Sequence, residues 1–207
     1  LNLNQPSSGV NQIFKEGIKQ LSFDLDHYLK LDHLKYFNRY KIQNFLVPTD
    51  FFDVFYFYKF IKNFSKKYNR FVEIGGGSGL LSSLLVSNKN LKAYQIDIAS
   101  YLLAQNLLLK NSSQYLLTER IQKYDSIDVE FAVNQDSFPE IKKEEAIKII
   151  EFLKKSNVNL FFSNNHMSNY KSQTDFRSLF IRSGFNNMIS FPNPIRQGYI
   201  IEVFKFE

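Results

Sequence analysis

The spacing of apolar residues divides the chain into a helical first third and an alternating remainder. Between residues 11 and 68, apolar side chains such as Leu21 and Leu25 recur every three or four positions, which predicts helices. A break at Pro48 interrupts this pattern, and either of the two polar residues after it can cap a second helix running to about Tyr68. That helix is apolar over too wide a surface to be exposed on one side. We therefore expect it to pack against a sheet or to form part of a substrate lid.

From residue 70 onward, short apolar runs alternate with amphipathic stretches. Strands are expected at 70–74, 91–98, 121–124, 127–133, 158–162, 188–191 and 199–206. Helices are expected at 80–87, 100–110, 140–156 and 175–183, the last of them ended by a glycine. Strands that alternate with helices predict an α/β fold with a parallel, doubly wound sheet. The last two strands have no helix between them, which predicts an antiparallel pair at one edge of the sheet.

The change of pattern near residue 69 gives the expected domain organisation. We expect residues 1–68 to form an N-terminal tail, disordered over residues 1–10, followed by a helical lid or cap section. Residues 69–207 are expected to form the ligand-binding domain. A length of 207 residues fits one α/β domain with a short addition, and it is too short for two full domains.

Composition and charge narrow the classes of function. The chain has no cysteine, which excludes a disulfide framework, a thiolate nucleophile and cysteine-ligated metal sites, and fits a reducing cytoplasm. The net charge of +6 comes from 26 basic and 20 acidic residues scattered along the chain, so we expect a solvated surface and no nucleic-acid partner. No apolar run approaches the roughly 18 residues that span a bilayer, and the first residues lack the features of a signal peptide. These features predict a cytoplasmic protein without a membrane span.

A glycine-rich run carries the strongest chemical signal. The apolar strand ends in the sequence EIGGGSGL, residues 73–80, and a helix is expected to follow. Glycines let the backbone approach a ligand closely, and ligands of open α/β sheets bind at such turns. Asp97 ends the next expected strand, where it can accept both hydroxyls of a ribose. A dinucleotide fingerprint requires glycine where Leu80 stands, and the chain has no Gly-Lys-Ser/Thr triplet of a P-loop.

The pattern Glu-x-Gly-x-Gly-x-Gly, from Glu73 to Gly79, followed by Asp97, resembles the S-adenosylmethionine site of class I methyltransferases. The resemblance covers about residues 70–207, and it implies a Rossmann-like, seven-stranded, mostly parallel sheet with S-adenosylmethionine as cofactor. It also implies that Glu73 lies near the amino acid part of the cofactor and that Asp97 holds the ribose. The cofactor-binding residues implied in this way are Glu73, Gly75, Gly76, Gly77, Gly79, Asp97, Ile98 and Asn134.

A narrower likeness is to the sugar O-methyltransferases of bacterial surface-polysaccharide clusters. It rests on the loop sequence Glu-Ile-Gly-Gly-Gly-x-Gly, on the pair Ile96-Asp97 and on the stretch Asn-x-x-Ser-Phe-x-Glu at residues 134–140. Members of that family also carry a helical N-terminal section. The likeness implies an O-methyltransferase of polysaccharide biosynthesis that acts on a hydroxyl of a sugar or glycan precursor.

Methyl transfer to a hydroxyl requires alignment of donor and acceptor and removal of a proton. Three residues beyond the fourth and fifth strands of the ligand-binding domain are candidates for this role: Asp136, Glu140 and His166. Histidine is the side chain best suited to proton transfer near neutral pH, but His166 can equally be a surface or supporting residue. Glu140 is expected at the start of a helix, where its charge alone can explain it. Asp136 can be a turn residue, a cap or a contact of the acceptor.

Several alternatives stay open. The acceptor can be another small molecule, methylated at nitrogen or at a phosphate-derived group, or the domain can be a non-catalytic cofactor-binding or partner module. A nucleic-acid methyltransferase is a weaker alternative, and a homo-oligomer is also open. Metal-dependent relatives need acidic residues where this chain has Asn134, Asn164 and Asn165. Because amides alone hold a divalent cation poorly, we expect no catalytic metal, and Asp136 is the residue that can overturn this.

Overall fold

The structure of the chain is a computed structural model that describes most of the predicted ligand-binding domain. The described residues are 39–42, 45–48, 50–64, 67–89, 91–109, 113–166 and 175–206. The expected tail at residues 1–10 and the first predicted helix, around Leu21 and Leu25, lie outside them. None of the helices in the described ranges is long and apolar enough to cross a membrane.

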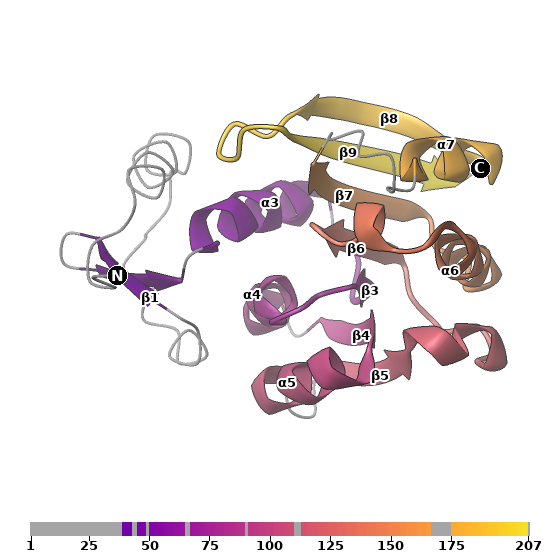
Figure 1. Cartoon of the computed structure of the whole chain (residues 1–207), viewed down its shortest axis with the longest axis horizontal. Helices are drawn as coiled ribbons and strands as arrows, with labels where there is room; N and C mark the ends of the chain where they lie inside the picture. The colour runs from indigo at the N-terminus through magenta and orange to yellow at the C-terminus, as the bar shows by residue number, and fades with distance from the viewer. Residues whose placement is uncertain are drawn as a thin grey trace.

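A seven-stranded sheet forms the centre of the molecule (Figure 1). Its strands are β3 (Arg70–Ile74), β4 (Lys92–Asp97), β5 (Ser113–Leu117), β6 (Phe131–Gln135), β7 (Leu160–His166), β8 (Phe185–Pro192) and β9 (Tyr199–Phe206). The strand order across the sheet is β5-β4-β3-β6-β7-β9-β8. The first five strands are parallel, and β9 is antiparallel to both β7 and β8. The predicted mostly parallel sheet with a closing antiparallel pair is therefore confirmed.

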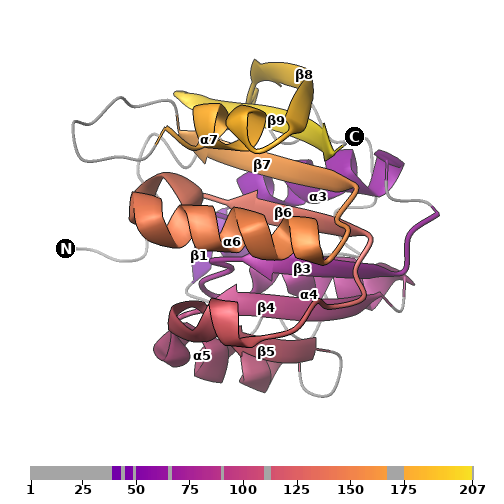
Figure 2. The ribbon, with the colours of Figure 1, turned by 90° about the vertical axis from the view of Figure 1, so that its right-hand side faces the viewer.

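Helices cover both faces of this sheet (Figure 2). They are α3 (Phe51–Phe64), α4 (Leu80–Lys89), α5 (Ala99–Leu109), α6 (Lys143–Lys155) and α7 (Phe176–Arg182). Two apolar cores result: one lies between the sheet and α3 and α4, the other between the sheet and α6 and α7. Burying an apolar surface on each face is the main source of stability in such a three-layer arrangement.

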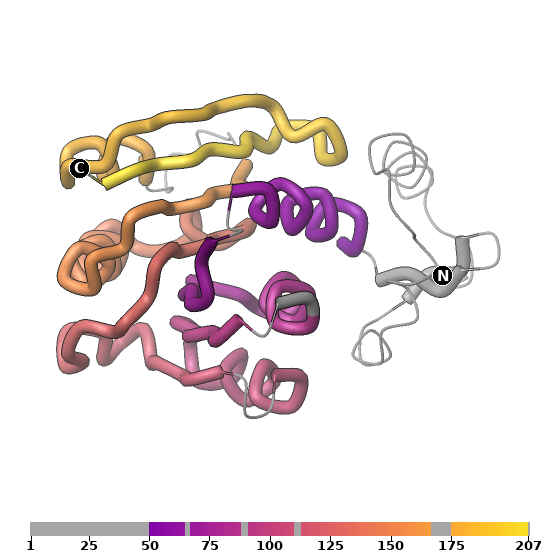
Figure 3. Tube along the Cα trace, turned by 180° about the vertical axis from the view of Figure 1, so that it is seen from behind, coloured from indigo at the N-terminus to yellow at the C-terminus, as the bar shows by residue number. Residues whose placement is uncertain are grey.

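The aromatic helix α3 packs into the first core. Phe51, Phe55 and Phe57 are fully buried there, together with Phe71 and Phe131 from the sheet. An apolar helix surface this wide needs cover on several sides, and the sheet and α4 provide it. The β8–β9 turn lies beside the first turns of α3 (Figures 1 and 3). The division of the chain near residue 68 stays a prediction.

The expectation of helix throughout residues 11–68 is wrong at two places. Strands β1 (Arg39–Ile42) and β2 (Phe45–Pro48) pair with each other in antiparallel orientation. Polar and apolar residues alternate in β1 with the two-residue period of a strand, whereas β2 is a short apolar run. Each strand has only four residues, and a helical pattern searched over a long window overlooks such short segments.

Some predicted boundaries in the remaining chain also differ. The third strand of the ligand-binding domain is β5, at Ser113–Leu117, and the expected strand at 121–124 lies mostly in a short 3-10 helix, η3 (Thr118–Lys123). The polar start of β5 concealed it, because β5 is an edge strand that is only partly buried. Strand β6 spans Phe131–Gln135, later than the predicted 127–133, and α6 begins at Lys143, after the separate short helix η4 (Phe138–Glu140).

Candidate functional site

The glycine loop connects β3 to α4 as predicted. Gly75 donates its N–H to the carbonyl oxygen of Ile96 at 2.8 Å, which fixes the loop to strand β4. The N–H of Gly79 donates to the carbonyl oxygen of Gly76, also at 2.8 Å, and turns the chain into the helix. Gly75 and Gly77 have φ of 62° and 51°, a region that favours glycine. The loop conformation therefore depends on these residues.

The glycines of the loop have different surroundings. A Cβ on Gly75 would lie 2.1 Å from Oγ of Ser137, and one on Gly79 would lie 3.2 Å from Cγ of Gln105. Around Gly77 nothing lies within 4 Å of such a Cβ. Gly75 and Gly79 thus make room for neighbouring side chains, while Gly77 borders open space.

That open space is a pocket of about 390 Å³ at the carboxyl ends of the central strands. Its volume is within the range of about 300–1,000 Å³ that is common for small-molecule sites. A ligand of an open α/β sheet is expected at this edge. The pocket is lined by Asp50, Val54, Glu73, Gly75, Gly76, Gly77, Ser78, Leu80, Leu81, Tyr101, Gln135, Asp136 and Arg196.

Glu73 brings a buried carboxyl group to this pocket. Its side chain is 1% exposed and accepts a hydrogen bond from Oγ of Ser82, which in turn accepts one from Nε2 of Gln95 at 2.7 Å. Gly76 leaves room for it, because a Cβ there would lie 2.7 Å from Oε2 of Glu73. Burial raises the pKa of Glu73 to about 7, with a smaller contribution from the charge of Asp97. A cationic ligand beside this carboxyl would favour its ionised form.

Asp97 holds the glycine loop directly. Its Oδ2 accepts the N–H of Gly77 at 3.1 Å and Nε2 of Gln105 at 2.9 Å, and its Oδ1 accepts the N–H of Ile98 at 2.8 Å. Burial raises the pKa of Asp97, and these three donors oppose that shift. The carboxylate lies against the loop but is not among the residues that line the pocket.

The remaining residues implied by the cofactor resemblance surround the loop. Nδ2 of Asn134 donates to the carbonyl oxygen of Ile74 at 2.7 Å and to Oγ of Ser137 at 2.5 Å, and its Oδ1 accepts from Nδ2 of Asn165 at 2.8 Å. These bonds join the ends of β3, β6 and β7. Asn134 therefore holds together the strand ends beside which the pocket lies. Neither Asn134 nor the half-exposed Ile98 lines the pocket, and the same is true of Gly79.

The three candidates for the proton-transfer step lie in different environments. Asp136 lines the pocket, directly after β6. His166 ends β7, and its ring centroid lies 5.7 Å from that of Tyr199 on the paired strand β9. Glu140 is exposed at the end of η4, three residues before α6 begins. The expectation that a helix start favours the charge of Glu140 is therefore wrong, because the backbone at Ile141 and Lys142 is not helical and separates η4 from α6.

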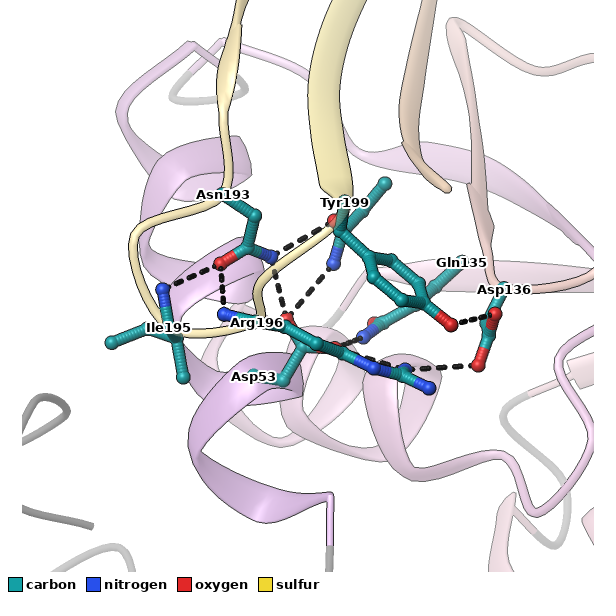
Figure 4. Close-up of polar contacts among 8 residues, drawn as sticks. Asp53, Gln135, Asp136, Asn193, Ile195, Arg196 and Tyr199 are labelled. Atoms are coloured by element: carbon teal, nitrogen blue, oxygen red, sulfur yellow. Dashed lines mark hydrogen bonds and ion pairs between the residues drawn. The ribbon is translucent and has the colours of Figure 1, made fainter. Parts of the chain in front are cut away.

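Asp136 is held by two side chains from the β8–β9 region (Figure 4). Nη1 of Arg196 lies 2.9 Å from Oδ2 of Asp136, and the hydroxyl of Tyr199 donates to Oδ1. The guanidinium of Arg196 lies over the ring of Tyr199, 3.8 Å from its centroid. Burial and the hydrogen bond to Asp136 raise the pKa of Tyr199 well above its usual range, so its hydroxyl remains a donor. The carboxylate of Asp136 is thereby fixed in one orientation.

Next to Arg196, the buried carboxylate of Asp53 on α3 is the centre of a group of polar contacts, here called the buried hub (Figure 4). Its Oδ1 accepts from Nδ2 of Asn193 at 2.6 Å and from Nδ2 of Asn164 at 3.1 Å. Its Oδ2 accepts from Nε2 of Gln135 at 2.9 Å, and Nη1 of Arg196 lies 3.4 Å away. Burial raises the pKa of Asp53, while these donors oppose the shift. The hub ties α3 to β6, to β7 and to the β8–β9 turn.

Sequence reasoning missed these supporting residues. Asp53 and Arg196 are 143 positions apart, and Gln105 lies on a helix where the pattern gives it no special place. One signal was available: Asp53 is a charged residue inside an otherwise apolar helix, which is rarely buried without partners. In the described part of the chain, no group of three or more histidine, aspartate or glutamate side chains is arranged to hold a metal ion.

Comparison with known proteins gives structural matches only. Neither models of protein families nor the curated proteins gave a match. Among solved structures, a TehB-like SAM-dependent methyltransferase from Corynebacterium glutamicum matches with a TM-score of 0.59 and 11% identity, over 73% of this chain and 87% of that one. The glycopeptide N-methyltransferase MtfA matches with a TM-score of 0.58 and 11% identity, over 74% and 90%. The mitomycin 7-O-methyltransferase MmcR matches with a TM-score of 0.57 and 11% identity, over 69% and 50%.

Together with the strand order, these matches define the class of fold. The chain has the Rossmann-like fold of class I methyltransferases, as its glycine loop predicts. The structural neighbours include both O- and N-methyltransferases. The chain spans about half of the length of some of them, such as TnmH, of which 51% is covered. At 9–12% identity these matches establish the fold, and the activity is a separate question.

Proposed function

We propose that this protein binds S-adenosylmethionine and transfers its methyl group to a hydroxyl of a sugar or glycan precursor. The observation that carries the proposal is the pocket beside the glycine loop, bordered by Gly77 and by the buried carboxyl of Glu73. A Cβ at Gly77 would enter open space, so a ligand can approach the backbone there. The fold and the loop pattern support the same donor.

The described residues suit the charge of this donor. When bound, S-adenosylmethionine supplies an electrophilic methyl group on a positively charged sulfur. Glu73 would face the cationic part, where ionisation of its carboxyl is favoured by the positive charge. Asp97 would hold the ribose from the end of β4, and Gly75, Gly76 and Gly77 would lie along the ligand. The other three residues that the cofactor resemblance implies are Gly79, Ile98 and Asn134. They would support the residues that contact the ligand and would not line the pocket themselves.

We propose Asp136 as the residue that binds the acceptor hydroxyl. Of the three candidates it alone lines the pocket, and Arg196 and Tyr199 fix its orientation. A carboxylate has about four lone-pair positions, so Asp136 can accept a hydrogen bond from the acceptor hydroxyl. It would take up the hydroxyl proton as the oxygen bonds to the methyl carbon and the carbon–sulfur bond of the donor breaks. His166, next to Tyr199, would receive the proton in a variant of this mechanism, and Glu140 is the weakest candidate.

The narrower likeness of the loop and of residues 134–140 supports a sugar or glycan acceptor. The described pocket lining carries three carboxyl groups, from Asp50, Glu73 and Asp136, and one guanidinium, from Arg196. Such a lining favours a cationic donor and an uncharged acceptor over an anionic acceptor. A role in polysaccharide biosynthesis in the cytoplasm belongs to the same proposal.

The first test is calorimetric titration with S-adenosylmethionine and, separately, with NADH. We expect micromolar binding of S-adenosylmethionine and none of NADH. Asp97→Asn should weaken binding at least tenfold, whereas Asp125→Asn, on the exposed surface, should bind like the wild type. Binding of NADH alone, or of neither compound, would contradict the proposed donor.

The acceptor class is tested by transfer of a radioactive methyl group. Neutral monosaccharides, amino sugars and sugar phosphates are incubated with the protein and labelled S-adenosylmethionine. Transfer to hydroxyls of neutral sugars supports the proposal. Transfer confined to amines or to phosphate groups would replace it with a methyltransferase of a different acceptor.

A further inference from the structure

Gln105 links the glycine loop to Asp97, the two parts of the proposed donor site. It lies on α5, is fully buried, and uses one amide nitrogen for two hydrogen bonds. Its Nε2 donates to Oδ2 of Asp97 at 2.9 Å and to the carbonyl oxygen of Gly77 at 3.1 Å. The N–H of Gly77 donates to the same Oδ2 at 3.1 Å. These three bonds form a closed triangle among Gly77 of the glycine loop, Asp97 at the end of β4 and Gln105 on α5.

The orientation of the Gln105 amide is fixed by charge. A flipped amide would place Oε1 against the carboxylate of Asp97 and against the carbonyl oxygen of Gly77, so both contacts would become repulsive. In the observed orientation Oε1 is buried and has no hydrogen-bond partner. Leaving a buried acceptor unpaired costs free energy, and the two donated bonds offset that cost. Gly79 makes room for the side chain, because a Cβ there would lie 3.2 Å from Cγ of Gln105.

The triangle also limits what Asp97 can still accept. A carboxylate offers about four lone-pair positions. Three are taken, by the N–H groups of Ile98 and Gly77 and by Nε2 of Gln105. One position is left, on the oxygen bonded to Ile98. This differs from the expectation that Asp97 accepts both hydroxyls of a ribose.

We propose that Gln105 is a positioning residue of the donor site, which restricts Asp97 to reading a single hydroxyl of the ribose. The inference rests on the proposed function, since it assumes a nucleoside in the pocket. Gln105 does not touch the nucleoside; it occupies lone pairs of Asp97 and keeps the glycine loop at a fixed distance from the end of β4.

The test measures how affinity depends on each ribose hydroxyl. S-adenosylhomocysteine and its 2′-deoxy and 3′-deoxy analogues are titrated into the wild type. We expect one analogue to bind about tenfold more weakly, which corresponds to one hydrogen bond, and the other to bind within threefold. Equal losses of tenfold or more for both analogues would overturn the single-hydroxyl inference, and so would no loss for either.

Gln105→Met removes both donors while nearly preserving the side-chain volume. It should bind S-adenosylhomocysteine about tenfold more weakly, and its preference between the deoxy analogues should fall below threefold. Gln114→Met is the matched control, because Gln114 is exposed on the edge strand β5. Affinity and preference in Gln105→Met that equal those of the control would overturn the role of Gln105.

Gln105→Glu distinguishes positioning from mere packing. An ionised carboxylate at position 105 would repel Asp97 at pH 8, whereas a protonated one can donate to Asp97 at pH 5.5. We therefore expect weak binding at pH 8 and recovery of at least fivefold at pH 5.5, relative to the wild type at the same pH. A variant that binds equally poorly at both pH values would indicate a packing role and contradict the inference.

Hydrogen exchange of the Gly77 amide separates this inference from the proposed function, because it needs no ligand. We expect slow exchange in the wild type and at least tenfold faster exchange in Gln105→Met. A wild type that binds no S-adenosylhomocysteine overturns the proposed donor. Unchanged exchange of Gly77 in Gln105→Met overturns the role of Gln105 alone.

Discussion

The buried carboxyl of Glu73 makes the stability of this protein depend on pH. Its pKa is raised from 4.5 to about 7, chiefly by burial. Between these two values the folded protein keeps a proton that the unfolded chain has lost. Because the folded state then binds more protons, the free energy of unfolding falls as the pH rises from about 4.5 to about 7. One pKa unit corresponds to about 1.4 kcal/mol, so the expected loss is about 3 kcal/mol.

The Glu73→Gln variant isolates this contribution. Glutamine has nearly the same shape and stays neutral, so the variant should lack the 3 kcal/mol loss and be more stable than the wild type at pH 8 by about that amount. Burial also raises the pKa values of Asp53, Asp97 and Glu202, and these carboxyls add slopes of the same sign in both proteins. The difference between the two proteins therefore reports on Glu73.

Urea unfolding followed by far-ultraviolet circular dichroism is a suitable assay, since the chain has no tryptophan. The free energy of unfolding is measured at intervals from pH 4.5 to pH 8 for the wild type, Glu73→Gln and Glu151→Gln, whose replaced side chain is exposed on α6. The control should follow the wild type. Parallel curves for the wild type and Glu73→Gln, within about 0.5 kcal/mol, would refute the reasoning about burial. With a cationic donor in the pocket, the ionised carboxyl gains a partner, so S-adenosylmethionine should stabilise the wild type more than Glu73→Gln at pH 8.

Four further substitutions test other parts of the site. Gly75→Ala should lose about 3 kcal/mol in urea unfolding because its Cβ meets Ser137, whereas Gly77→Ala should lose only about 1 kcal/mol from its positive φ. Gly77→Ala should nevertheless bind S-adenosylmethionine more weakly in calorimetry; a larger stability loss than that of Gly75→Ala would contradict the assigned contacts. Arg196→Met should lower the rate of methyl transfer at least tenfold while donor affinity stays within threefold, and loss of both together would place Arg196 in the donor site. Asp53→Asn should lose about 3 kcal/mol in urea unfolding, because the new amide N–H groups would face side chains that now donate hydrogen bonds to Asp53. A loss below 1 kcal/mol would argue against the buried hub.

Local features of the sequence were sufficient for the central unit of the fold. The strand before Gly75, the loop and the helix after it depend on neighbouring residues, on apolar runs and on the conformational freedom of glycine. The antiparallel pair at the end of the chain was predictable for a similar reason, since no helical segment separates its strands. Strands β1 and β2 and the edge strand β5 escaped prediction, because short or partly exposed strands carry a weak periodic signal.

Only the tertiary structure decided which side chains meet. The pattern placed Asp97 at the end of a strand, but its bonds to Gly77 and Gln105 follow from the packing of α5 against the loop. The contact of Asp53 with Asn193 joins residues 140 positions apart, and no periodicity encodes it. Periodicity reports which face of an element is buried. The partners across that face depend on strand order and helix packing, which act on the chain as a whole.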